Sequence, residues 1–244
     1  MKWEFEEDYI VCNFYFSYIE TWRQHKEVIM SRLASAGYGQ REWKSVRMRL
    51  QNFEYLHTGR GLPNVAKLTE DMYNMTVRRK SNPHIYSDLE EYISTHYIKG
   101  DEIDATDTVI EHENLLLSGE PQNSHNFLYT RPLGPSFQEV LFEFIDERNM
   151  KDSQVYNACR VGWDTFSLIR SGKRGVSKRT VRQLCFGLKL SFEESVRLME
   201  SAGYAFSDNN LADAIVVYYL KKKEYDIYEV NATLYENNAE LLFS

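Results

Sequence analysis

The chain is poor in cysteine and proline and has no long apolar run. Its 244 residues include 3 Cys, 5 Pro and 12 Gly. Cys12, Cys159 and Cys185 are far apart and match no CxxC or Cys/His spacing, which argues against a disulfide framework and against a zinc site. We therefore expect each cysteine to be a small buried side chain in a reducing compartment.

No apolar run approaches the roughly 20 residues that a membrane span needs. The first residues, MKWEFEEDY, are acidic, which argues against a signal peptide. We expect a soluble, cytoplasmic protein with no membrane partner.

The chain also lacks an excess of positive charge. Its formal net charge is −7, and its pI is near 5.5. The surface as a whole is therefore not positively charged, and a nucleic-acid site requires local clustering of Lys and Arg. With 43% hydrophobic and 14% aromatic residues, the chain can build the core of one large domain or of two ordinary ones.

Catalytic and metal-binding patterns are missing as well. The six histidines show no HExxH or comparable spacing, and GRG at Gly59–Gly61 lacks the GxxxxGK[ST] pattern of a phosphate loop. We assign no catalytic residue, metal ligand or cofactor. An enzyme whose active site lies unrecognised in residues 1–130 stays open as an alternative.

Residues 1–80 predict an N-terminal helical domain. Apolar residues, including Ile19, recur at helical spacing from Tyr18 to Leu33, and again from Trp43 to Phe53. Arg41 and Arg47 fall away from the second apolar face, as expected of an amphipathic helix with a charged outer side.

Residues 81–135 predict a partly helical, acidic linker region that ends in the turn sequence PLGP. Residues 136–244 then predict closely spaced helices without a strand. Ser136 begins this block as an N-cap, with Glu139 as its capping-box partner. The expected fold class is mainly α, with five helices in the C-terminal domain followed by a helical tail.

The segment VGWDTFSLIRSGKRGVSKRTVRQLCFGLKLS resembles the phage-repressor-like (XRE-type) helix-turn-helix family. Phe166 and Ile169 match the buried positions of the recognition helix, and Gly172-Lys173-Arg174 matches the basic turn after it. Ser177 matches the cap of the next helix. The resemblance covers about residues 137–206 and implies a five-helix fold that binds duplex DNA.

A longer resemblance includes the tail. SFQEVLFEFIDERNMKDSQVY, LMESAGYAFS and YDIYEVNATLYENNAELL are similar to a C-terminal module of bacterial proteins that is sometimes found behind macro domains. This likeness implies a bacterial, cytoplasmic origin and no particular ligand.

Basic residues gather around the turn. Asp164 is the only acid between Cys159 and Leu190, and such clustering suits phosphate neutralisation. The alternative is an ordinary solvated basic face. The candidate nucleic-acid contacts in this segment are Thr165, Ser167, Arg170, Lys173, Arg174, Ser177, Lys178, Arg179 and Arg182.

The positions that read bases in this family depart from its pattern. Gly162, Trp163 and Asp164 stand at the exposed start of the recognition helix, and Leu168 follows, so base contacts are poorly supplied. Asp152 stands where the family usually has a phosphate-binding Gln. Trp163 and Leu168 also suit a protein interface. The alternative hypothesis is therefore a protein-interaction adaptor in a defence or toxin–antitoxin system, which binds a protein partner or forms a homodimer with a second copy.

SVRMRLQNFEYLHTGRGLPN, residues 45–64, is similar to helical segments beside HNH-type nucleases and other bacterial restriction and phage-defence modules. This likeness implies that Arg47, with Arg49, adds to a DNA-binding surface; the alternative is a packed bundle with a charged outer face. The leading hypothesis is a non-enzymatic nucleic-acid-binding regulator or accessory factor of a bacterial cell that holds DNA by its phosphates.

Overall fold

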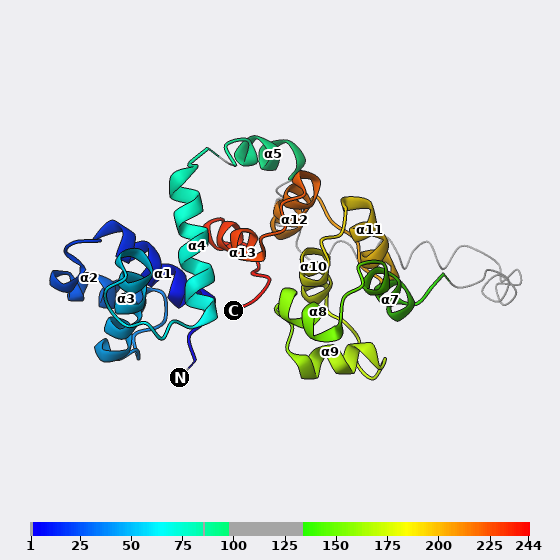
Figure 1. The fold of residues 1–244 in the computed structure, drawn as a ribbon. Helices are drawn as coiled ribbons and strands as arrows, with labels where there is room; N and C mark the ends of the chain where they lie inside the picture. Colours follow the sequence, from blue (N-terminus) through cyan, green and yellow to red (C-terminus); the bar gives the residue numbers. More distant parts are fainter. Residues whose placement is uncertain (1, 85, 98–133) are drawn as a thin grey trace, which may run out of the picture. The chain divides into compact units, whose positions relative to one another are not determined.

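The chain divides into two compact, helical units. The computed structural model describes residues 2–84, 86–97 and 134–244, and within these ranges it contains helices and turns but no strand, so the mainly α class is confirmed. Unit 1 comprises residues 1–90 and 224–244, and unit 2 comprises residues 91–223 (Figure 1). Most of the predicted acidic linker lies outside the described residues. In the described part, no helix has the length and apolarity to cross a bilayer.

Unit 1 is a helical bundle in which α1 packs against α2, α3 and α4, and α13 packs against α4 (Figure 1). A short 3-10 helix, η1, precedes α2, and α5 (Leu89–His96) begins in unit 1 and continues into unit 2. The elements are α1 (Phe5–Ser17), η1 (Trp22–Gln24), α2 (Lys26–Ser35), α3 (Trp43–Thr58), α4 (Lys67–Ser81) and α13 (Ile227–Glu236).

The start of unit 1 differs from the helix predicted from Tyr18 to Leu33. The first helix ends at Ser17, and a turn follows in which η1 buries Trp22. Ile19 is consequently 36% exposed instead of lying on an apolar face. Ile29 and Leu33 are buried, but they belong to the separate helix α2. Because α2 keeps these residues at helical spacing, the sequence pattern did not indicate the break before it.

Residues 224–244 also lie elsewhere than in the predicted second domain. They belong to unit 1, where Arg79 of α4 forms an ion pair with the buried Glu229 of α13. The ring of Phe243 packs edge-on against that of Phe5, with centroids 5.3 Å apart. This burial of charge and of aromatic surface explains why the tail joins the N-terminal helices.

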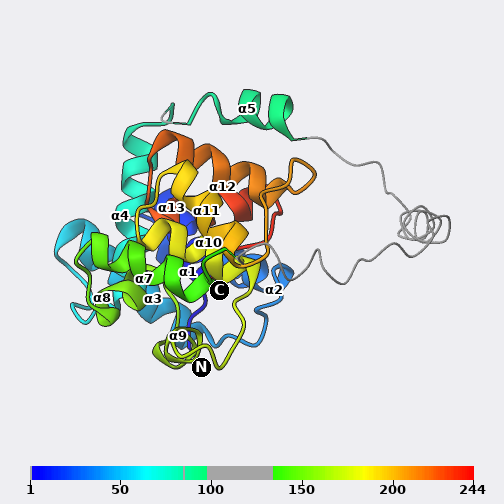
Figure 2. The ribbon, with the colours of Figure 1, turned by 90° about the vertical axis from the view of Figure 1, so that its right-hand side faces the viewer.

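Unit 2 contains the five helices expected from Phe137 to Phe206, followed by a sixth. Figure 2 shows them as the green, yellow and orange ribbons. Apolar side chains between α7, α8, α10 and α11 form its core, and Cys159 and Cys185 are buried there, as Cys12 is in unit 1. The elements are α7 (Phe137–Glu147), α8 (Asp152–Ala158), α9 (Trp163–Arg170), α10 (Lys178–Gly187), α11 (Phe192–Ser201) and α12 (Leu211–Lys222).

Candidate nucleic-acid interface

Helix α9 presents one face to the core and one to solvent. Phe166 and Ile169 are 2% and 1% exposed, which confirms their predicted buried positions. At about 100° per residue, the remaining face is an arc of roughly 160°. Its exposed members, in order around the helix, are Arg170, Trp163, Ser167, Asp164 and Leu168. The predicted apolar pair is therefore separated by a hydroxyl and a carboxylate, and Arg170 lies beside Trp163 at one margin.

The basic turn after α9 is closed by backbone hydrogen bonds. Gly172 donates its N–H to Ile169 O at 3.1 Å, and Lys173 donates to Leu168 O at 3.1 Å, the pair of bonds that defines a Schellman motif. Gly172 has φ +67°, a left-handed conformation that glycine adopts without strain. The turn thus holds the backbone of Lys173 and Arg174 in place while both side chains remain exposed.

Helix α10 begins with the predicted cap. Ser177 Oγ accepts a hydrogen bond from Thr180 N at 3.2 Å, which satisfies one of the unpaired N–H groups of the first turn. Lys178 and Arg179 occupy the first two helical positions. Because no acid lies in the first turn of α10, the positive end of the helix dipole adds to the charge of the turn.

Two of the predicted phosphate contacts are instead used inside unit 2. Arg182 is 1% exposed, and its Nε lies 2.8 Å from Asp213 Oδ1, so it is removed from the candidate interface. Lys178 Nζ lies 2.5 Å from Asp213 Oδ2. Asp213 is itself 1% exposed and also accepts the N–H of Ser207 at 2.9 Å. A buried carboxylate thus fixes two cations of α10 against α12.

Arg170 is also held by an internal acid. Its guanidinium forms an ion pair with Asp152 at the start of α8 and lies over the ring of Phe142, 5.3 Å from the centroid. Both charged side chains are about half exposed. Asp152, which would repel a phosphate at that position, is therefore neutralised by the arginine predicted to bind one.

The predicted arginines of unit 1 also divide into exposed side chains and buried side chains that form internal ion pairs. Arg47 on α3 is exposed, as predicted, but Arg49 is 8% exposed, with its Nε 3.0 Å from Asp8 Oδ1. Arg41 is 6% exposed and forms an ion pair with Glu7, although the sequence placed it on the outer face. Burial raises the pKa of Asp8 to about 6, partly offset by the charge of Arg49.

A small exposed set remains from the predicted contacts. Lys173 and Arg174 form no ion pair with any other described residue, and Ser167 lies on the exposed face of α9. Thr165 and Arg179 are half-buried, and Arg179 has an internal contact. Asp213, the partner of Lys178 and Arg182, was not predicted from the sequence. Its place three residues after the N-cap Asn210 indicated a capping acid at most.

Among the described residues, no three His, Cys, Asp or Glu side chains gather in a group that could hold a metal ion. No family model, curated protein or solved structure matches the chain.

Proposed function

We propose that this chain is a non-enzymatic, cytoplasmic bacterial protein that binds duplex DNA through its phosphates, as a regulator or accessory factor. The observation that carries the proposal is the turn between α9 and α10. It holds the adjacent exposed cations Lys173 and Arg174 on a backbone fixed at both ends, next to the capped start of α10. Exposed Lys and Arg side chains and the N–H groups of a helix N-terminus are both typical phosphate contacts, which fix position without reading sequence.

The exposed face of α9 favours binding without strong base preference. In the major groove Asp164 can only accept hydrogen bonds, typically from cytosine N4, and Leu168 offers only apolar contact. Trp163 is too large to approach a base edge as the amide and guanidinium groups of typical readers do. Sequence-specific contacts would therefore be few, and the affinity would come from phosphate neutralisation.

The number of free cations sets the salt dependence. With two phosphate contacts, log K should fall with log[salt] with a slope of about −1.8, so that affinity drops roughly tenfold between 50 and 200 mM salt. The six basic residues predicted as contacts in this segment would together have given a far steeper slope. A modest slope is thus the specific consequence of the ion pairs at Asp213 and Asp152.

The test is a fluorescence-anisotropy titration of random duplex DNA at several salt concentrations. The double variant Lys173→Gln/Arg174→Gln should abolish most of the salt dependence and weaken binding at 50 mM salt at least tenfold. The control Lys221→Gln/Lys222→Gln removes the same charge from the end of α12. Equal affinity of wild type and turn variant, or equal losses in both variants, would refute the proposal.

A second candidate function is a protein-interaction adaptor in a defence or toxin–antitoxin system. Trp163 is 64% exposed, far more than a tryptophan side chain usually is, and Leu168 is 39% exposed. Exposed aromatic residues of this size are frequent anchors of protein interfaces. Light scattering of wild type and of Trp163→Ala/Leu168→Ala tests for a homodimer. A dimer that dissociates in the variant, together with no DNA binding by wild type, would favour this candidate.

A further inference from the structure

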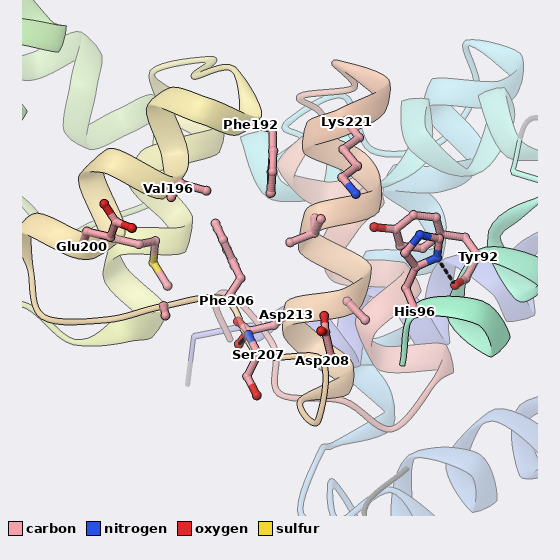
Figure 3. Close-up of a pocket in the computed structure, with 14 residues that line it drawn as sticks. Tyr92, His96, Phe192, Val196, Glu200, Phe206, Ser207, Asp208, Asp213 and Lys221 are labelled. Carbon is pink, nitrogen blue, oxygen red and sulfur yellow. Dashed lines mark hydrogen bonds between the residues drawn. The ribbon is translucent and has the colours of Figure 1, made fainter. Parts of the chain in front are cut away.

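A cleft in unit 2 is bordered by α5, α11, α12 and the loop before α12 (Figure 3). Its volume is ≈ 330 Å³. This volume is at the lower end of the range of about 300–1,000 Å³ for small-molecule sites, so the cleft has room for one small ligand. The residues that line it all belong to unit 2.

Helical spacing gives the cleft its apolar walls. Phe192, Val196 and Met199 recur at intervals of four and three on α11, so they share one face of that helix. Ala214 and Val217 line the cleft from α12, where they also share a face. An apolar group that enters between these walls loses its contact with water, and the gain in free energy grows with the area that is buried.

Aromatic rings contribute to the walls from several elements. Phe192 and Phe206 stack with their ring centroids 6.1 Å apart and an interplanar angle of 28° (Figure 3). Tyr92 lines the cleft from α5. All three rings are partly exposed, so a ligand can contact them. Because contacts between rings add to the effect of burial, these walls favour an aromatic body over an aliphatic one of the same size.

Lys221 is the one Lys or Arg among the described residues that line the cleft. It recurs at helical spacing after Ala214 and Val217, and so lies on their face of α12. Its Nζ lies 5.2 Å from the ring centroid of Phe192 and 5.5 Å from that of Tyr92. No carboxylate of another described residue forms an ion pair with it. The two rings therefore hold the ammonium at the cleft while its hydrogen bonds remain available to an anion.

The acidic residues of the cleft lie apart from Lys221. Figure 3 shows Glu200 on α11 and Asp208 beside the start of α12, whereas Lys221 lies near the end of α12. Asp213 also lines the cleft, but its oxygens already bind two cations and a backbone N–H. These acids repel an anionic group and Lys221 attracts it, so the charges favour an anion at the Lys221 side of the cleft.

We propose that the cleft binds a small aromatic carboxylate. The ring of the ligand lies against the apolar walls, and its carboxylate accepts hydrogen bonds from the ammonium of Lys221. Two sources carry this chemistry: a free arylalkanoic acid and the C-terminal aromatic residue of a peptide. Neither Lys173 nor Arg174 lines the cleft, so the proposal does not depend on DNA binding.

Calorimetric titration with probes that share one phenyl ring tests the preference for a negative charge. Wild type should bind 3-phenylpropanoate about three- to tenfold more tightly than the neutral 3-phenylpropanamide, as expected for an ion pair that is partly shielded from water. 3-Phenylpropylamine should bind more weakly than the amide because of the acids of the cleft. The aliphatic analogue 3-cyclohexylpropanoate should bind more weakly than 3-phenylpropanoate.

Nα-acetyl-phenylalanine distinguishes the two sources, because it adds the amide of a peptide to the same ring and carboxylate. Tighter binding than that of 3-phenylpropanoate supports the proposal with a peptide C-terminus as the ligand. Weaker binding supports it with a free acid as the ligand.

Two matched variants test the role of Lys221. Lys221→Met removes the charge but keeps an unbranched side chain, and it should bind 3-phenylpropanoate and 3-phenylpropanamide equally. The control Lys222→Met removes the neighbouring cation, which lies over the ring of Tyr218, and should keep the wild-type preference. Both lysines are exposed, so both variants should keep the wild-type circular dichroism and unfolding midpoint.

A nuclear magnetic resonance titration locates the bound ring. The methyl signals of Val196 and Val217 should shift on addition of 3-phenylpropanoate, whereas those of Leu168, on the exposed face of α9, should not. The proposal is overturned if wild type shows no saturable binding of 3-phenylpropanoate, or if the amide, the amine or the cyclohexyl acid binds as tightly. It is also overturned if Lys221→Met and Lys222→Met weaken binding equally, or if the signals of Leu168 shift instead of those of the two valines.

Discussion

Replacing Asp213 by Asn should destabilise unit 2 strongly. The carboxylate is 1% exposed and neutralises Arg182, which is also 1% exposed, across the contact between α10 and α12. The substitution preserves the shape of the side chain and leaves the guanidinium as an uncompensated buried charge. Breaking a buried ion pair in this way costs about 3–5 kcal/mol. Lys178 adds less, because 27% of its side chain is exposed and water can take over part of its solvation.

The expected loss can be measured as amide hydrogen exchange. A cost of about 4 kcal/mol raises the population of opened molecules roughly 10³-fold. Amides of α10 and α12 that exchange through opening of unit 2 should lose protection by that factor, while amides of α3 in unit 1 serve as the internal reference. Urea titration followed by circular dichroism gives the same free energy from the shift of the unit 2 transition.

A second variant separates charge from packing. Asp213→Asn/Arg182→Met removes both buried charges, and apolar replacement of a whole buried pair is often neutral or stabilising. The double variant should therefore be at least about 2 kcal/mol more stable than Asp213→Asn alone. A single variant within about 1 kcal/mol of wild type, or a double variant no better than the single one, would show that Arg182 is not desolvated as the structure places it.

Three further substitutions test other parts of the fold. The pKa of Asp8 is raised from 3.8 in the unfolded chain to about 6 in the folded protein. The protonated carboxyl therefore contributes to the stability of unit 1 fully below pH 3.8, and this contribution is lost as the pH rises through 6, so that this group makes unit 1 up to about 3 kcal/mol less stable at pH 7 than at pH 4. Urea titrations of Asp8→Asn across that window should lack this dependence on pH. Gly187→Ala should cost about 1–3 kcal/mol in unit 2, because the added Cβ would lie 2.7 Å from the backbone N of Cys159, whereas Gly175→Ala, which meets open space, should change the unfolding midpoint little. Glu229→Gln should weaken the attachment of α13 by about 2–3 kcal/mol through its lost arginine pairs, seen as faster exchange of α13 amides; unchanged exchange would contradict the role of the ion pairs.

Local features of the chain could be predicted from the sequence because their partners are near in sequence. Ser136 and Glu139 form the predicted capping box three residues apart, and Ser177 caps α10 as expected. Phe166 and Ile169 are buried because three-residue spacing places them on one face of a helix. The spacing of apolar residues shows which side of a helix faces the core, so the helices of unit 2 could be predicted from it.

Charge pairing could not be predicted in the same way. Arg182 and Asp213 are 31 residues apart, and Arg49 and Asp8 lie on different helices, so only the packing of the helices shows which cations are neutralised. The cluster of Lys and Arg in the sequence therefore predicted more DNA contacts than the folded protein leaves exposed. The same applies to α13, whose charged residues pair with α4 of unit 1 although the chain reaches them only after unit 2.

Unit 2 is inserted within unit 1, and this nesting has a consequence for biosynthesis. Residues 224–244 complete unit 1, yet the ribosome adds them only after residues 91–223, whose synthesis takes roughly 7–27 s at about 5–20 residues per second. During that interval unit 2 can fold as a separate body, while the surface of α4 that receives α13 is open and its arginines face water. A chain that terminates before residue 224 therefore lacks the helix that packs against α4 and cannot complete unit 1.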